Sequence, residues 1–106
     1  MKQLLKTDHL SQKKAIITQL SKIIDPELDI DIVNIGLIYG IQEIKNNNWL
    51  ITFTLTYPGC PLISFFEGEI KKKIREIEGV ADVKTRLVFK PSWSRQMMHP
   101  NLINSC

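Results

Sequence analysis

One cysteine stands where a strand-like pattern gives way to a helix-like pattern. Cys60 lies between Pro58-Gly59 and Pro61, after an alternating apolar segment and before a helical apolar period. The first backbone amides of a helix lack intrahelical partners, and the helix dipole is positive there. Both effects stabilise a thiolate, which is the form of cysteine that binds metal or attacks an electrophile. The sequence therefore predicts a functional Cys60, against the alternative of a buried cysteine that packs as a small apolar side chain.

The second cysteine, Cys106, is far from the first along the chain. Two cysteines are too few for a disulfide framework, so we expect a reducing compartment and place the protein in the cytoplasm. A Cys60–Cys106 disulfide, or a redox pair in which Cys106 resolves Cys60, is the alternative. Neither His9 nor His99 has metal-ligand spacing with another histidine or cysteine.

Acidic and apolar residues alternate strictly between positions 25 and 32. The acidic members are Asp25, Glu27, Asp29 and Asp31, and the apolar members are Leu28, Ile30 and Ile32. The run lacks the glycine and the distant glutamate of an EF-hand calcium loop. Alternation favours an extended segment, so we interpret the acidic residues as a solvated edge beside buried apolar ones. A functional role for Asp25 and Glu27 requires the fold to bring them near Cys60.

A helix is predicted to begin at Ser11 and to be ended by Pro26. Ser11 can cap its start, and Pro26 disfavours helical backbone in the residue before it. Its apolar stripe comprises Ile16, Ile17, Leu20, Ile23 and Ile24. Residues 33–36 are predicted to form a turn and residues 37–44 a strand, followed by a hairpin turn at Asn46–Asn48.

The clearest predicted strand covers residues 49–57. One face carries Trp49, Ile51, Phe53 and Leu55, and the other carries Leu50, Thr52, Thr54 and Thr56. We expect the first face to pack on helices and the second, the threonine face, to meet solvent or a partner. A second helix is predicted over residues 61–78, ended by a glycine cap at Gly79. The last predicted strand covers residues 83–89.

These elements predict the fold class α/β (α+β), with the order α-β-β-α-β. The last strand should run parallel to the second, and both helices should cover one face of a small mixed sheet, which gives two layers. We expect one domain over residues 11–98, a flexible lead-in over residues 1–10 and a short tail over residues 99–106. Within the domain, Trp93, Met97 and Met98 either cap the core or present a surface to a partner.

Composition excludes several functional classes. The 106 residues carry a formal charge of +3, which is too small for a dedicated nucleic-acid binder. Lys71 and Lys73 each follow a glutamate by four residues, so this helix face neutralises itself. No apolar run reaches the length of a membrane helix. We therefore expect neither nucleic acid nor membrane among the partners.

Several linked motifs resemble one known family. The residues that carry the resemblance are Asp25-Pro26-Glu27, Ile32 to Tyr39, Thr54 to Pro61, Glu78-Gly79-Val80, Pro91-Ser92-Trp93 and Met97-Met98. They are similar to the motifs of the SufT-like and PaaD-like family of iron–sulfur assembly domains, in the same order and over about residues 12–98. Asn34 stands where many members have aspartate, and Tyr57 replaces a residue that is often small.

The resemblance implies an accessory role in the maturation of iron–sulfur proteins rather than an enzymatic one. It makes Cys60 the important motif cysteine, Asp25 and Glu27 the acidic motif pair, and Thr56 the motif threonine, while Gly59 lets the backbone turn beside the cysteine. The cofactor implied is iron or an iron–sulfur cluster, held transiently. We expect Cys60 either to ligate this iron or cluster or to dock a cluster carrier. The partners implied are assembly or carrier proteins and apo client proteins.

Cluster sites normally use four cysteine ligands, and this sequence offers one good candidate. A cluster bridging two protomers of a homodimer, or completed by ligands of a partner, is therefore favoured over a stable cluster on a monomer. The rival hypothesis is a metal-free adaptor that recruits targets through the threonine face and the Trp93–Met98 segment. A PaaD-like role in maturing an oxygenase is a branch that the sequence does not separate.

Overall fold

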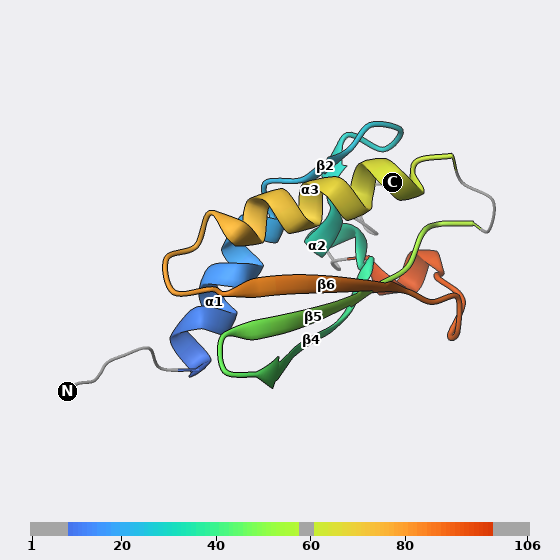
Figure 1. Ribbon diagram of the computed structural model, residues 1–106. Helices are drawn as coiled ribbons and strands as arrows, with labels where there is room; N and C mark the ends of the chain where they lie inside the picture. The colour runs from blue at the N-terminus through green and yellow to red at the C-terminus, as the bar shows by residue number, and fades with distance from the viewer. Residues whose placement is uncertain (1–8, 58–60, 99–106) are drawn as a thin grey trace.

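The computed structural model describes residues 9–57 and 61–98. The elements, in chain order, are α1 (His9–Leu20), β2 (Ile24–Asp25), β3 (Ile30–Asp31), α2 (Ile32–Ile35), β4 (Ile38–Lys45), β5 (Asn48–Phe53), α3 (Ile63–Arg75), β6 (Asp82–Leu87) and the 3-10 helix η1 (Arg95–Met97) (Figure 1). In this part of the chain, no helix is both long enough and apolar enough to cross a membrane.

The main sheet has three strands in the order β4-β5-β6. β4 pairs antiparallel with β5, and the two join at a tight turn in which Asn47 adopts a φ of 63°. β6 pairs parallel with β5, with Asn48 opposite Asp82 and Phe53 opposite Leu87. The predicted hairpin and the predicted parallel crossover are therefore confirmed.

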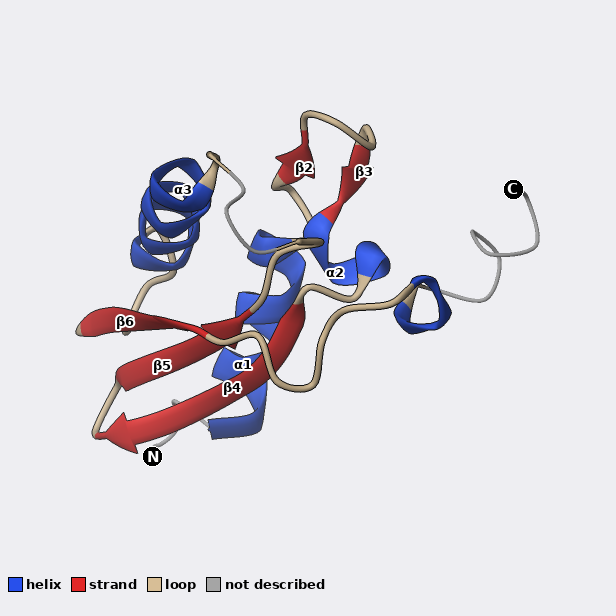
Figure 2. Cartoon of the chain, turned by 90° about the vertical axis from the view of Figure 1, so that its right-hand side faces the viewer, coloured by secondary structure: helices blue, strands red, loops and turns tan. Residues whose placement is uncertain are grey.

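The core lies between the sheet and the two long helices. On β5, Trp49, Ile51 and Phe53 are buried, whereas the alternate residues are half-buried. From the helices, the core receives Ile16, Leu20, Phe66, Ile70 and Ile74. Figure 2 shows α3 above β6, and α1 behind β4 and β5. The mixed α+β architecture of the prediction is therefore confirmed, and the structure adds a second, two-stranded sheet of β2 and β3.

The first helix differs from the prediction at both ends. α1 begins at His9, so Ser11 lies inside it, and it ends at Leu20 rather than before Pro26. The backbone after Leu20 instead pairs with a later segment, since the amide of Ile32 donates to the carbonyl of Ile23. Two members of the predicted apolar stripe are exposed, Ile17 of α1 at 39% and Ile24 of β2 at 44%.

The acidic run is a hairpin rather than one extended segment. β2 and β3 pair antiparallel, and the turn between them includes Asp29 at a φ of 58°. Leu28, which the alternation placed in the core, lies in this turn and is 42% exposed. Residues 33–36 were expected as a turn, but Ile32–Ile35 form the one-turn helix α2, which Gly36 ends at a φ of 90°.

Two further expectations were wrong in detail. Thr54, assigned to the outer threonine face, is fully buried, because its amide leaves the β5 pattern and donates to the carbonyl of Leu37 at 2.8 Å. α3 ends with Glu76 as its C-cap, so Gly79 lies three residues beyond the cap, at a φ of 94°.

Adjacent aromatic residues on α3 test this packing. Phe66 is 1% exposed in the core, whereas Phe65 is 43% exposed and touches Phe66 edge-on, with ring centroids 5.3 Å apart. We expect Phe66→Ala to lower the free energy of unfolding by about 3–5 kcal/mol in urea denaturation, because it removes a fully buried ring. Phe65→Ala should lose at most about 1.5 kcal/mol, the scale of one aromatic contact. Equal losses would show that α3 buries a different face.

Candidate functional site

The junction between β5 and α3 is described on both sides of the motif cysteine. β5 ends at Phe53, Thr56 is half-buried and Tyr57 is 43% exposed. The chain is described again from Pro61, which begins the turn into α3. Gly59 and Cys60, two of the predicted site residues, lie outside the described residues.

The first turn of α3 has no side-chain cap. Leu62 occupies the N-cap position and makes no capping hydrogen bond, and the first turn carries no acidic residue. The first helical hydrogen bond runs from the amide of Phe66 to the carbonyl of Leu62 at 3.0 Å. The positive end of the dipole is therefore not countered by a side chain of the helix itself.

The acidic motif pair forms a turn of its own. Asp25 is only 3% exposed, and its Oδ1 accepts hydrogen bonds from the amides of Glu27 at 2.7 Å and Leu28 at 3.1 Å. Glu27 contributes its backbone to this arrangement, and its side chain is exposed. The carboxylate of Asp25 thus orders the β2–β3 turn, as side-chain acceptors do at turns.

Of the three predicted partner residues, Trp93 contacts α2, Met97 contacts β4, and Met98 is buried. Trp93 Nε1 donates to the carbonyl of Ile35 at 2.9 Å, and Met98 is only 7% exposed. Met97 is half-buried, with its sulfur 3.2 Å from the hydroxyl of Tyr39. The buried Met98 fits the core-capping alternative, whereas Met97 keeps a partly accessible surface.

Gly36 and Tyr39 hold this segment in place, and the sequence reasoning gave neither a role. The Tyr39 hydroxyl donates to the carbonyl of Pro91 at 2.8 Å. Burial raises the pKa of Tyr39 above its usual value, partly offset by a side-chain hydrogen bond with Thr54, so the hydroxyl stays a donor at neutral pH. A side chain at Gly36 would collide with the backbone of Met97. Both residues lie in the motif from Ile32 to Tyr39, and membership of that motif was the sequence signal that could have indicated their role.

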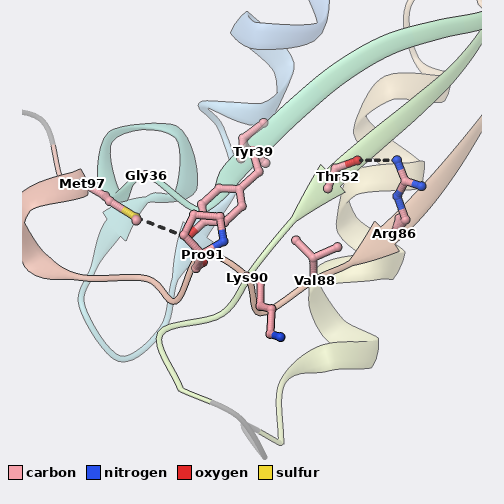
Figure 3. Close-up of a pocket in the computed structure, with 9 residues that line it drawn as sticks. Gly36, Tyr39, Thr52, Arg86, Val88, Lys90, Pro91 and Met97 are labelled. Carbon is pink, nitrogen blue, oxygen red and sulfur yellow. Dashed lines mark hydrogen bonds between the residues drawn. The ribbon is translucent and has the colours of Figure 1, made fainter.

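A groove of about 760 Å³ lies beside this segment (Figure 3). Its lining comprises Gly36, Ile38, Tyr39, Thr52, Arg86, Val88, Lys90, Pro91 and Met97. Thr52 is a member of the predicted threonine face, and Met97 is a predicted partner residue. Arg86 lies in the last predicted strand and Lys90 directly follows it, but no sequence pattern linked either residue to Tyr39.

No preformed metal centre is found in the part of the chain that the structure describes. Within residues 9–57 and 61–98, no group of three or more histidine, cysteine, aspartate or glutamate side chains could hold a metal ion. The acidic turn is therefore not a metal site by itself.

Comparison with known proteins decides the family. The sequence pattern of the family described as iron–sulfur cluster assembly protein matches residues 13–85. The chain belongs to this family. It is 38% identical over 86 residues to the Fe-S protein maturation auxiliary factor YitW of Bacillus subtilis, which covers 81% of this chain and 84% of the relative. It is also 37% identical over 76 residues to the Fe-S protein maturation auxiliary factor SufT of Staphylococcus aureus, covering 72% and 86%.

A solved structure agrees with the fold. A domain of unknown function from Bacillus anthracis superposes with a TM-score of 0.82 at 32% identity, over 91% of each chain. The resemblance to SufT-like proteins is therefore confirmed, and the family supports a role in iron–sulfur assembly. The individual duties of Cys60, Asp25, Glu27 and Thr56 remain predictions.

The acidic turn of this family member yields a matched pair of variants. Asp25→Ala should lower the free energy of unfolding by about 1–3 kcal/mol, because two amides lose their acceptor at a buried position. Glu27→Ala should stay within about 0.5 kcal/mol of the parent, because its side chain is exposed. Chemical denaturation measures both. A larger loss at Glu27 would mean that its side chain makes the structural contact.

Two glycines test how the 91–98 segment is held. Gly36→Ala should cost at least about 1–2 kcal/mol, because its positive φ is strained for a residue with a Cβ, and the collision with Met97 adds to this. Hydrogen exchange should then accelerate across residues 91–98. Gly68→Ala, inside α3 with open space around it, should instead stabilise by about 0.5–1 kcal/mol. Unchanged exchange in Gly36→Ala would show that the segment does not depend on this contact.

Proposed function

We propose that this family member is an accessory factor, not an enzyme, that accepts iron or an iron–sulfur cluster transiently through the Cys60 thiolate and delivers it to client proteins. The family carries the general role in iron–sulfur assembly. The thiolate role rests on the motif cysteine and on the local electrostatics of the chain that follows it.

The observation that supports Cys60 most directly is the uncapped start of α3. The helix begins at Ile63, three residues after Cys60, and Leu62 supplies no capping side chain. Three basic residues, Lys72, Lys73 and Arg75, sit in the last turn, where they complement the negative end of the dipole. The first turn carries no acidic side chain that would occupy the positive end of the dipole. A thiolate that precedes this helix is therefore stabilised by the dipole, the effect that lowers cysteine pKa values at helix starts.

The ligand count makes the cluster a cargo rather than a resident group. Four thiolates are the usual requirement, and the described residues contain no cluster of candidate ligands to supplement Cys60. We propose that the remaining ligands come from a second protomer, a carrier protein or the apo client. Transfer is then favoured, because a cluster held by one chain's single thiolate exchanges readily for a complete ligand set.

This proposal names its partners by chemistry. They are proteins that deliver iron–sulfur clusters and apo proteins that need them, with a homodimer as one way to complete the ligands. The cytoplasm is the proposed compartment, because a thiolate donor of this kind needs a reducing environment. Asp25 and Glu27 support the proposal indirectly, through the ordered turn that the carboxylate of Asp25 holds.

A second candidate function is a metal-free adaptor that recruits client proteins. The observation that favours it is the groove lined by Thr52 and Met97, which joins the threonine face to the 91–98 segment. In that case Cys60 would be dispensable and the groove essential. A PaaD-like duty in oxygenase maturation belongs with either candidate, since it differs only in the client.

The two cysteines give the decisive comparison. We expect wild-type protein, reconstituted anaerobically with iron and sulfide, to show a visible charge-transfer absorption band that Cys60→Ser lacks and Cys106→Ser keeps. Iron per chain and the mass of the reconstituted species then tell whether two protomers share the cluster. In a transfer assay, Cys60→Ser should lose activation of an apo client while its circular dichroism spectrum stays native.

Two outcomes would contradict the thiolate role. Full activation of an apo client by Cys60→Ser would leave the adaptor as the function. Loss of the band in both serine variants would instead point to a redox pair or a two-cysteine site.

A further inference from the structure

The groove lies on the face of the sheet opposite the helices. Thr52 of β5 and Arg86 of β6 are cross-strand neighbours in the parallel register, and both line it. The chain after β6 forms the other wall, with Val88, Lys90 and Pro91. Figure 3 shows the Arg86 side chain beside Thr52, with Val88 between Arg86 and Lys90.

The charge of the groove has one sign. Its lining contains two cations, Arg86 and Lys90, and no carboxylate. In the described part of the chain, neither cation forms a salt bridge, and Arg86 makes only a long contact of 3.5 Å to the hydroxyl of Thr52. Both side chains are exposed. They are therefore available to a negatively charged partner.

A second hollow on the same sheet has different electrostatics. It is lined by Ile44, Lys45, Asn48, Trp49, Asp82 and Lys84. There the amide of Val83 and the guanidinium of Arg75 lower the pKa of Asp82, so a carboxylate accompanies the lysines. Lys84 lies two residues before Arg86 on the same strand, which makes it a matched control for charge alone.

The remaining lining of the groove is mostly apolar and only half-buried. Ile38, Tyr39, Val88 and Met97 are half-buried, and no lining residue is fully buried. A small molecule usually enters a site that encloses most of its surface. An open groove with an apolar floor and two cations at its rim is suited to a peptide that keeps one side in solvent.

We propose that this groove binds an acidic segment with alternating apolar residues, presented by a partner protein. The carboxylates pair with Arg86 and Lys90, and the apolar side chains rest against Tyr39, Val88 and Met97. The proposal rests on the proposed function, because the partner is a client or an assembly protein. It assigns recognition of that partner to the groove and leaves cluster binding to Cys60.

The test uses two labelled hexapeptides, one alternating glutamate with leucine and one alternating glutamine with leucine, measured by fluorescence anisotropy. We expect the acidic peptide alone to bind, with an affinity that falls as salt is added, because its ion pairs are exposed. The double variant Arg86→Gln/Lys90→Gln should weaken binding about tenfold, as expected from two exposed ion pairs. Lys84→Gln should stay within about twofold, since it removes the same charge outside the groove.

Several results would overturn the proposal. The first two are equal binding of the two peptides and no binding by either. The third is an equal loss of affinity in Lys84→Gln and in the double variant. The fourth is displacement of the acidic peptide by an equal concentration of octanoate, which would assign the groove to a small amphipathic anion. Cys60→Ser serves as a separate check and should bind the acidic peptide normally. Peptide binding and the cluster band are thus lost independently, so failure of this proposal is distinguished from failure of the thiolate role.

Discussion

The parallel pairing of β5 with β6 is the constraint on which the rest of the structure depends. Two parallel neighbours must be joined by a crossover, here α3, because their carboxyl ends meet at the same edge of the sheet. The chain that leaves β5 toward Cys60 and the chain that leaves β6 toward Lys90 therefore start side by side. The pairing extends past the strands, since the amide of Val88 donates to the carbonyl of Phe53 at 2.9 Å. One topological requirement thus places the end of β5 and the groove at the same end of the sheet.

The same edge explains why the motif around Gly36 is so constrained. α2 ends in a residue with positive φ, and the 91–98 segment crosses directly over that residue. Trp93 Nε1 then donates to the carbonyl of Ile35, the last residue of α2, while the hydroxyl of Tyr39 donates to the carbonyl of Pro91. These contacts turn a segment with no periodic pattern into a wall of the groove. The same few residues therefore pack the chain, end α2 and line the candidate binding groove.

The sequence predicted what depends on local periodicity and failed where tertiary pairing decides. The alternation of Trp49, Ile51 and Phe53 predicted β5 and its buried face, because alternate residues of a strand point to opposite faces of the sheet. The predicted end at residue 57 was wrong, because β5 ends at Phe53. The acidic alternation looked equally regular, yet β2 and β3 pair with each other and send Leu28 outward. Thr54 continues the pattern of β5 in sequence but is buried, because the carbonyl of Leu37 draws its amide inward.

The candidate site shows the same division. Cys60 could be singled out from its neighbours alone, because proline, glycine and a helix start act within a few residues. The groove could not, because Tyr39, Arg86 and Met97 lie far apart in sequence and meet only through the crossover and the return of the chain over Gly36. The separation has a chemical consequence. In the two proposals, a single thiolate cannot by itself select a client, whereas a cationic apolar groove can supply that selectivity without adding a ligand. The two proposals together divide the labour, with the cargo held by Cys60 and the recipient selected by the groove of the sheet.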